Sequence, residues 1–416
     1  MTWKNIRYWL KPGIRVKRYL ALAGFGFLLS LLGAGVLGRS LAEGGGREAL
    51  FAGGGAIALG ALLLVLGVRW MNRSILAVLE DPDEVPKLVF QKRRLAQGPK
   101  IVAMGGGTGL SRLLKGLKDV TTNTTAVVAT TDDGGSTGRL RRAFDIPAVG
   151  DLVDCLAALS EAPRAPELMQ YRFTRGGELA GHTFGNLFLV TLHELTGSFA
   201  EALRSANRML ALSGWVWPST VDPAVLAAEF EDGRVIQGET EIRKAGGRIR
   251  RLALLPEDPA VMPEVVAAIA EAEMVVLGPG SLFTSVIASF LPQAVRRAVR
   301  ESPAPLVQVV NLMTEPGETD GMDAFAHVEA LAAHLGRWPD VVLVHTGPIA
   351  PGVRRRYAAE GRYPVAYDPR PFRERGIRVV TGDFAESGRF AQHDPEKLKK
   401  ALLALHAETA AAPAPV

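Results

Sequence analysis

Three glycine-rich turns in this sequence could bind an anion, because glycine leaves backbone N–H groups uncovered. The first turn lies between the apolar run KIVAM and the helical pattern SRLLKGLKDV and consists of Gly105, Gly106, Gly107, Thr108 and Gly109. A turn between a strand and a helix places these groups at the positive helix end, where phosphate binds. It is no Walker A loop, and Leu110 replaces the third glycine of a dinucleotide-binding fingerprint. A tight structural turn is the alternative interpretation.

The second turn adds carboxylates to the same type of position. It follows the apolar run TTAVVATT and contains Asp132, Asp133, Gly134, Gly135 and Ser136. Adjacent carboxylates at a strand end can hold a ribose, coordinate Mg²⁺ or act as a base. Asp132 and Asp133 are therefore candidate metal ligands, and Asp133 is the candidate catalytic residue. A solvated turn is the alternative.

A third turn follows the run MVVL and consists of Gly278, Pro279, Gly280 and Ser281. If the three strands belong to one sheet, their turns meet at one edge, which predicts a nucleotide-like ligand with several phosphates. Other polar residues stand in loops that a pocket would use, and His182 lies in a loop framed by glycines. These further candidates are His182, Asn186, Asn311 and Asp320.

The elements that would position these turns alternate between short apolar runs and helical patterns. After the first two runs the strand patterns are MVVL at 274–277, LVQVV at 306–310, DVVLV at 340–344 and IRVV at 377–380. This alternation predicts an α/β fold with a Rossmann-like, doubly wound and mostly parallel sheet. Asp232-Gly233 between alternating runs predicts a small β-hairpin excursion within 229–255. A C-terminal helix is expected from Pro395 to about Ala407, followed by a frayed tail.

Composition excludes several classes of protein. The single cysteine, Cys155, can form neither an internal disulfide nor a thiolate zinc site. The net charge of +5 is unevenly distributed, since residues 1–98 hold 14 Lys/Arg against 6 Asp/Glu and the remainder holds 34 against 37. The larger part of the chain therefore lacks the basic surface of a nucleic-acid-binding protein, and no nucleic-acid partner is expected.

The N-terminal region is apolar enough to cross a membrane. Residues 19–38 and 49–68 are uncharged runs of 20 residues, joined by the ten residues 39–48. Each could span a hydrocarbon core of about 30 Å. Basic residues flank both outer ends, which predicts a multi-pass hairpin in the cell membrane with both termini and the main domain in the cytoplasm. A buried hairpin of a soluble protein is the alternative interpretation.

These patterns divide the chain into four regions. They are a transmembrane helical hairpin at 1–75, a linker at 76–98, an α/β domain at 99–394 that carries the glycine turns, and a C-terminal helix with its tail at 395–416.

Six separated motifs together resemble the YvcK-type gluconeogenesis factors of the CofD-like superfamily. In chain order they are IVAMGGGTGLSRLLKGL, TTDDGGSTGRLR, DIPAVGDLVDCLAALSE, GHTFGNL, GPGSLFTSV and NLMTEPGETDG. The resemblance implies that the domain at 99–394 is a CofD-like nucleotide-sugar-binding domain, which binds a UDP-sugar such as UDP-N-acetylglucosamine and affects cell-wall precursor supply and cell shape. It also implies that the first glycine turn and Asp132/Asp133 face the phosphates and ribose, and that Gly278 to Ser281 close the pocket.

The resemblance also supplies an enzymatic alternative. The 2-phospho-L-lactate transferase branch moves a phosphoryl-linked group from a nucleotide-activated donor. This sequence departs from the family pattern at Phe283, where a tyrosine is expected, and GMDAFAH at 321–327 lacks a threonine that some relatives offer to a kinase. The sequence contains no complete nucleophile or acid–base set, so it favours a membrane-tethered, non-catalytic regulator that binds a nucleotide-sugar. Such a regulator is expected to form a homo-oligomer and to act on a partner enzyme of cell-wall or amino-sugar metabolism, without a certain cofactor but with Mg²⁺ as a candidate. An NAD-dependent oxidoreductase is the third hypothesis.

Overall fold

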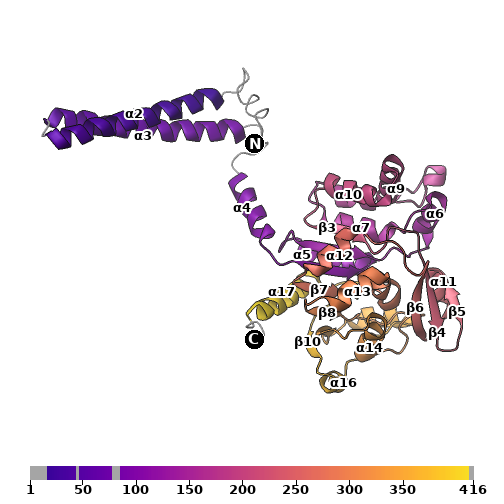
Figure 1. Cartoon of the computed structure of the whole chain (residues 1–416). Coiled ribbons are helices and arrows are strands. Elements are labelled where there is room, and N and C mark those ends of the chain that lie inside the picture. Colours follow the sequence, from indigo (N-terminus) through magenta and orange to yellow (C-terminus); the bar gives the residue numbers. More distant parts are fainter. Residues whose placement is uncertain (1–15, 44–45, 77–84, 412–416) are drawn as a thin grey trace. The chain divides into compact units, whose positions relative to one another are not determined.

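The computed structural model describes residues 16–43, 46–76 and 85–411 (Figure 1). The chain separates into two compact units, Met1–Arg93 and Arg94–Val416, which are described separately. The first unit contains the apolar hairpin, and the second, called the body below, contains the α/β fold.

The hairpin consists of two long helices, α2 (Val16–Glu43) and α3 (Arg47–Leu76). Both are long and apolar enough to cross a membrane, and only 17% and 11% of their most apolar windows are buried within the protein. A core helix of a soluble protein is mostly covered, so this low burial is consistent with the predicted membrane hairpin. The predicted spans 19–38 and 49–68 lie inside these helices. Of the basic residues before the first span, Lys17 and Arg18 lie in α2, and Lys4, Arg7, Lys11 and Arg15 lie outside the described residues.

Glycine allows the two helices to approach closely. A Cβ built on Gly26 would lie 2.6 Å from the Gly60 carbonyl oxygen, and one on Gly33 would lie 2.7 Å from the Gly53 carbonyl oxygen. By contrast, a Cβ on Gly54 meets nothing within 4 Å. Small residues that bring backbones together are the usual contact between membrane helices, where apolar side chains gain nothing by leaving lipid.

The Gly60→Leu substitution should therefore separate the helices, whereas Gly54→Leu, in the same helix, should leave them packed. We expect Gly60→Leu to lower the stability of the hairpin by about 1–3 kcal/mol, the cost of forcing bulk into a tight contact. The measurement is the distance between two spin or fluorescent labels, one on α2 and one on α3, in the full-length protein in detergent. Equal label separations in the two variants would contradict the close glycine contact.

The body contains, within its described residues, a seven-stranded sheet in which every pairing is parallel. Its strand order is β10-β9-β8-β7-β1-β2-β3. The chain thus builds outward from β1 to one edge, returns beside β1 and builds outward to the other edge, which is the doubly wound arrangement. The predicted Rossmann-like fold is confirmed. The strands are β1 (Ile101–Gly105), β2 (Thr124–Val128), β3 (Trp215–Pro218), β7 (Met274–Leu277), β8 (Leu306–Val309), β9 (Val341–His345) and β10 (Arg378–Gly382).

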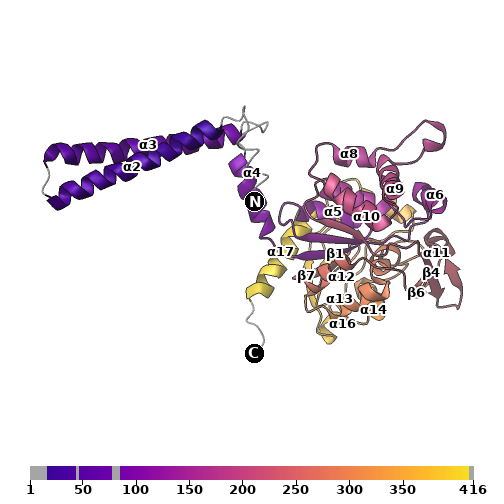
Figure 2. The same cartoon turned by 45° about the horizontal axis from the view of Figure 1, so that its top comes forward.

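Helices cover both faces of this sheet (Figures 1 and 2). Helices α5 and α7 pack against β1, β2 and β3 from one side, and α12, α13 and α14 lie on the other. The helical segments are α5 (Gly107–Leu117), α6 (Gly135–Phe144), α7 (Gly150–Leu159), α8 (Ala165–Gln170), η1 (Gly177–Leu179), α9 (Phe184–Thr196), α10 (Phe199–Met209), α12 (Pro263–Ala270), η2 (Leu282–Ile287), η3 (Ala288–Phe290), α13 (Gln293–Glu301), α14 (Ala324–Leu335), α15 (Pro351–Ala359) and α16 (Arg370–Glu374).

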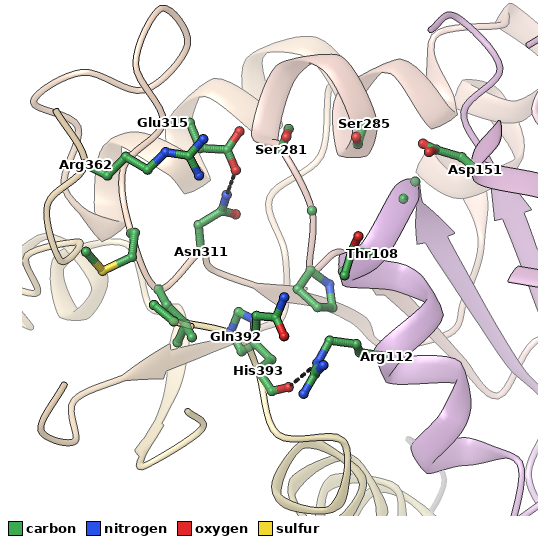
Figure 3. A pocket seen from close by; sticks show the side chains of 18 of the residues that line it. Thr108, Arg112, Asp151, Ser281, Ser285, Asn311, Glu315, Arg362, Gln392 and His393 are labelled. Carbon is green, nitrogen blue, oxygen red and sulfur yellow. Dashed lines mark hydrogen bonds between the residues drawn. The ribbon is translucent and has the colours of Figure 1, made fainter. Parts of the chain in front are cut away.

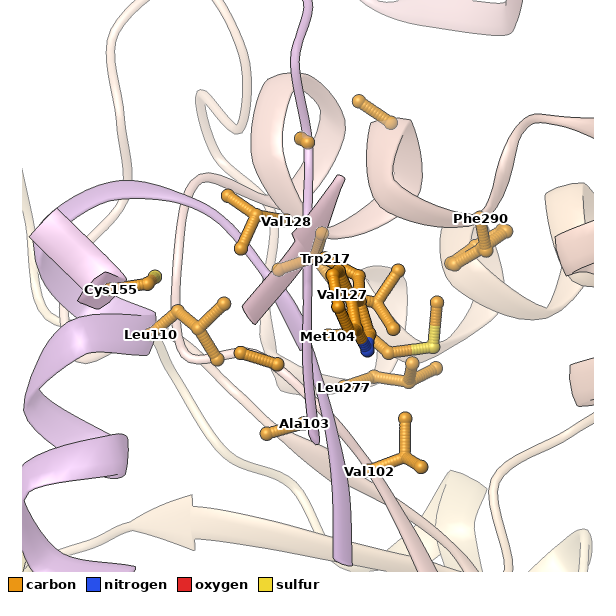
Figure 4. Close-up of a cluster of buried hydrophobic side chains, with 14 of the residues drawn as sticks. Val102, Ala103, Met104, Leu110, Val127, Val128, Cys155, Trp217, Leu277 and Phe290 are labelled. Atoms are coloured by element: carbon orange, nitrogen blue, oxygen red, sulfur yellow. The ribbon is translucent and has the colours of Figure 1, made fainter. Parts of the chain in front are cut away.

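The core explains why the strands read as continuous apolar runs. Strands β1, β2, β7 and β8 are buried along their whole length, because helices cover both faces. Met104, Val127, Trp217 and Leu277 form one row across the sheet on a single face, while Leu110 and Cys155 pack on the other (Figure 4). This core makes the carboxyl ends of the strands a rigid edge.

The predicted excursion is an antiparallel sheet of three strands, β4 (Val225–Phe230), β5 (Val235–Gln237) and β6 (Ile249–Leu255), with helix α11 (Glu239–Ala245) after β5. The turn between β4 and β5 contains Gly233 at φ +84°, a conformation that glycine adopts without strain. Two segments are more helical than the sequence suggests. Within 76–98 the structure has helix α4 (Val85–Ala96), and the C-terminal helix α17 (Pro395–Ala411) continues past Ala407.

Candidate functional site

A cavity of about 480 Å³ opens at the carboxyl ends of β1 and β7, where the strand order reverses. Ligands of doubly wound folds bind at this type of crevice. Figure 3 shows polar side chains directed into it from several elements. Its lining residues are Gly106, Gly107, Thr108, Gly109, Arg112, Asp132, Asp151, Glu239, Arg243, Pro279, Gly280, Ser281, Ser285, Asn311, Leu312, Met313, Glu315, Tyr357, Arg362, Ala391, Gln392 and His393.

The amino end of α5 faces this cavity. Gly107 begins the helix at φ +59°, and the preceding Gly106 has extended backbone. The N-cap residue Gly106 has no side chain that could cap the helix, and the Asp151 carboxylate accepts a hydrogen bond from the Gly107 N–H. The helix end thus presents N–H groups to an acceptor at the cavity, as in anion sites at helix N-termini. A Cβ built on Gly109 would collide with the Pro279 carbonyl, so glycine here lets the turns after β1 and β7 touch. The two turns thus form one continuous wall.

Arg243 brings the excursion into the site. Its Nε donates a 2.8 Å hydrogen bond to Glu318, and Nη2 donates to the Ser281 hydroxyl at 3.0 Å. The Glu318 carboxylate is completely buried and also accepts bonds from the backbone N–H and hydroxyl of Thr284. Burial alone would lower the pKa of Arg243, but Glu318 and the neighbouring carboxylates Glu239 and Glu315 raise it overall. Arg243 is therefore a permanent cation at the cavity wall.

Three carboxylates, those of Asp132, Asp151 and Glu239, line the same cavity, and Glu239 lies 3.7 Å from Arg243. Burial, with the charge of Asp132 as the next cause, raises the pKa of Asp151 to about 7. Burial and Asp132 also raise the pKa of Glu239 to about 8. In both groups burial is the largest cause, and the like charge of Asp132 adds to it, while Arg243 acts in the opposite direction. The site therefore suits an additional positive charge or a proton-accepting role.

This arrangement predicts a pH-dependent stability. Between the ordinary glutamate pKa of 4.5 and the folded value of about 8, the folded protein binds a proton at Glu239 that the unfolded chain has released. The free energy of unfolding therefore falls as the pH rises through this window. We expect Glu239→Gln to stabilise the protein at pH 8 by on the order of 1–3 kcal/mol, and much less at pH 5.

The measurement is urea unfolding of the full-length protein in detergent at both pH values. The matched control is Glu241→Gln on the same helix, where the side chain is exposed and pairs with Lys244. An equal gain from Glu239→Gln at pH 5 and pH 8 would contradict the raised pKa.

A second cavity, of about 510 Å³, adjoins the first and shares Asp132 and Asp151 with it. Its remaining walls come from the turn after β2, from α7, from the end of α8 with Arg172, and from the start of α9. In that wall the Ser136 hydroxyl bonds the His182 ring at 2.8 Å and accepts a hydrogen bond from the Asn186 amide at 3.1 Å. Burial, then Arg139 and Arg172, lower the pKa of His182. The three side chains thus hold the turn after β2 against α9.

The structure distributes the sequence-predicted residues over these two cavities. Gly106, Gly107, Thr108, Gly109, Asp132, Pro279, Gly280, Ser281 and Asn311 line the first cavity. Gly134, Gly135, Ser136 and Asn186 line the second, together with Asp132. The residues that line neither are Gly105, Asp133, His182, Gly278 and Asp320.

Asp133 and Asp320 make local structural bonds instead. One oxygen of Asp133 accepts bonds from the N–H and hydroxyl of Thr240, at 3.0 and 2.6 Å, and so holds α11. Asp320 accepts the Gly317 N–H at 2.7 Å. Asp132, with Asp151, therefore takes the place at the cavity that the sequence analysis gives to Asp133.

Several lining residues carry no signal in the sequence. Glu239 and Arg243 come from the excursion, more than 100 residues after the first glycine turn, and Arg362, Gln392 and His393 come from segments after the last predicted turn. Among the described residues, no group of three or more His, Cys, Asp or Glu side chains forms a metal site. A divalent cation here would thus depend on Asp132, Asp151 and ligand oxygens.

Comparison with known proteins agrees with this fold. The family model described as 2-phospho-L-lactate transferase CofD matches residues 101–385. A protein of Deinococcus radiodurans, provisionally named a gluconeogenesis factor, is 42% identical over 97% of this chain and 90% of its own length. The chain belongs to the gluconeogenesis factor family of CofD-like proteins. The gluconeogenesis factor of Bacillus subtilis is 40% identical over 75% of this chain and 99% of its own length.

A relative of known structure has the same α/β fold as the body. The crystal structure of a protein from Bacillus halodurans aligns with a TM-score of 0.72 and 39% identity, over 74% of this chain and all of the other. Family membership and the doubly wound fold predicted from the motifs are thus shown. The CofD-like domain places the family beside transferases, while its named members are gluconeogenesis factors.

Proposed function

We propose that this gluconeogenesis factor family member is a membrane-tethered regulator that binds a UDP-sugar, with UDP-N-acetylglucosamine as the first candidate. The proposal depends on one observation: the turns after β1 and β7 and the amino end of α5 line one cavity with three arginines. The cations that a diphosphate needs are supplied by Arg112, Arg243 and Arg362. One arginine can bind two phosphate oxygens at once, through two parallel hydrogen bonds. About 480 Å³ is a typical volume for a ligand of this size.

A magnesium ion fits this site by its chemistry. Mg²⁺ in proteins usually takes one or two carboxylates together with phosphate oxygens. Asp132 and Asp151 line the cavity and repel each other, so a cation that accompanies the diphosphate would relieve that repulsion. Its contribution would be to neutralise the ligand's charge, while Asp132 and Asp151 hold it.

The test is isothermal titration of the full-length protein in detergent with UDP-N-acetylglucosamine, with and without Mg²⁺. We expect saturable heat, and weaker binding of UDP or of the sugar phosphate alone, because each lacks part of the contacts. No heat and no thermal shift at millimolar ligand would overturn the proposal.

The membrane part of the proposal is supported by helices α2 and α3 and by the exposure of their apolar side chains. Tethering would keep the sugar-nucleotide site near lipid-linked wall synthesis, where an amino-sugar or cell-wall enzyme would respond to the bound state and affect cell shape. A reporter fused after Val416 is expected in the cytoplasm, and the protein in the carbonate-resistant membrane fraction. Recovery of the full-length protein in the soluble fraction would refute this topology.

A transferase is the second candidate, because the second cavity would give an acceptor access to Asp151. In this reaction an acceptor hydroxyl attacks the β-phosphorus, its proton passes to the Asp151 carboxylate, and the bond to the leaving UMP breaks. A pKa of about 7 suits Asp151 for accepting that proton. Release of UMP that Asp151→Asn abolishes would establish turnover, whereas ligand binding without UMP release supports the regulator.

A further inference from the structure

A third cavity, of about 480 Å³, lies at the opposite end of the sheet from the proposed nucleotide site. It is formed by the amino ends of β1, β2 and β3 and by helices α10 and α12, through Ile101, Thr125, Trp215 and Ala268 among others. It shares no lining residue with the other two cavities. A role for it is therefore independent of the proposed function.

Two stacked indoles form the apolar side of this cavity. Trp215 and Trp217 lie on one face of β3, with ring centroids 5.6 Å apart and planes 11° from parallel. Trp217 is only 4% exposed, whereas Trp215 is 47% exposed. An exposed tryptophan on a stack offers its free face to a further ring, and aromatic pairs of this kind contribute about 0.5–1.5 kcal/mol beyond area burial.

Two ion pairs hold the elements around the cavity together. Arg204 on α10 bonds Glu264 on α12 at 2.6 Å, and Lys100 bonds Glu271 at 2.9 Å. All four side chains line the cavity, so it is framed by salt bridges. A partner helix with side chains is about 10–12 Å across and would have to break these pairs, whereas a single planar ring system would not.

One cation of the lining is not neutralised. Arg208 lies one turn after Arg204 on α10 and is exposed. Among the described residues no carboxylate forms an ion pair with it, and its guanidinium makes only a long bond of 3.5 Å to the Ser205 hydroxyl. A planar guanidinium group binds a carboxylate or a phosphate in a bidentate manner, through two parallel hydrogen bonds. The cavity therefore carries one excess positive charge beside an aromatic face.

The outer edge of β3 is closed to another strand. The buried amide of Asn207 accepts the Val216 N–H at 2.9 Å and donates to the Val216 carbonyl at 3.0 Å. It thus occupies the backbone groups that an added strand would need. The occupant of the cavity is consequently not an extended peptide that continues the sheet.

We propose that this cavity is a second small-molecule site that takes a planar aromatic anion, of about the size of a bicyclic ring. The ring stacks on the free face of Trp215, and its carboxylate or phosphate pairs with Arg208. Such a site would let a second metabolite bind at the amino end of β1 while the sugar-nucleotide cavity lies at its carboxyl end.

The test uses 2-naphthoate as the anionic probe and 2-naphthamide as its neutral counterpart. Both are titrated calorimetrically into the full-length protein in zwitterionic nanodiscs, with empty nanodiscs subtracted. We expect saturable binding of 2-naphthoate, at least tenfold tighter than that of 2-naphthamide. Trp215→Leu should weaken both probes, and Arg208→Gln should weaken only the anion, by about tenfold.

The control variant is Arg300→Gln, an exposed arginine on α13 that does not line the cavity. Unchanged thermal unfolding of each variant shows that its fold is intact. Absence of saturable 2-naphthoate binding, or 2-naphthoate affinity that neither Trp215→Leu nor Arg208→Gln alters, would overturn the proposal. A change of oligomeric mass in Trp215→Leu without probe binding would identify the patch as a protein interface and likewise overturn it.

Discussion

Replacing Arg243 with methionine is expected to lower the free energy of unfolding of the body by about 2–3 kcal/mol. Arg243 pairs with the completely buried Glu318 carboxylate at 2.8 Å. Removing one partner of a buried pair leaves a charge without compensation, which typically costs about 3–5 kcal/mol. The Arg243 side chain is 45% exposed, so water screens part of this interaction. The expected loss is therefore smaller than for a fully buried pair, at about 2–3 kcal/mol.

The same substitution should disconnect the excursion from the sheet edge, since Arg243 also bonds Ser281 in the turn after β7. The measurement is urea unfolding followed by tryptophan fluorescence. In the double variant Arg243→Met/Glu318→Gln the buried charge is gone as well, so at least half of the lost stability should return. Lys244→Met, which removes an exposed pair with Glu241 on the same helix, should cost less than about 0.5 kcal/mol. Equal losses in the single and double variants would show that the ion pair is not the cause.

Reversing the charge of Arg362 is expected to weaken UDP-N-acetylglucosamine binding about 100-fold without unfolding the protein. Arg362 lines the first cavity beside Glu315 and Asn311 (Figure 3), and 42% of its side chain is exposed. A hydrogen bond to a charged group contributes about 1.5–3 kcal/mol, and Arg362→Glu replaces attraction of the diphosphate by repulsion. The stability of the fold should hardly change, because the Glu360 pair of Arg362 is long, at 3.6 Å.

The matched control is Arg355→Glu. Arg355 lies on α15 and shares a small surface pocket with Arg362 but does not line the cavity. Its reversal changes the net charge by the same amount, so the affinity should stay within about threefold if direct contact rather than long-range steering is responsible. Calorimetric titration of both variants measures this. Similar losses in Arg362→Glu and Arg355→Glu would contradict a direct phosphate contact.

The alternation of apolar runs with helical patterns was sufficient to predict the parallel sheet. Runs such as MVVL and LVQVV are buried along their whole length, and continuous burial is characteristic of strands covered by helices on both faces. The Asp232-Gly233 turn likewise predicted the excursion, since its positive φ is a local requirement. The edge strand β3 (Trp215–Pro218), the third strand of the excursion and helix α4 were not predicted, because none of them has a distinctive turn or periodicity of its own.

The site could be predicted only in part. The sequence indicated which turns follow strands, but it did not distinguish the two neighbouring aspartates. Asp133 is turned toward Thr240, more than 100 residues away, while Asp132 faces the cavity. Arg243 and Arg362 were not predicted, since nothing in their local sequence separates them from ordinary surface arginines.

By itself, then, the sequence determined the membrane-length helices, most of the strands and helices, and the glycine turns, because each depends on neighbours within a few residues. The tertiary structure alone decided which charged groups meet at the edge of the sheet and which of them become buried there. The physical reason is that a side chain's direction, burial and pKa depend on segments that are distant in the chain and become neighbours only when the sheet closes around them.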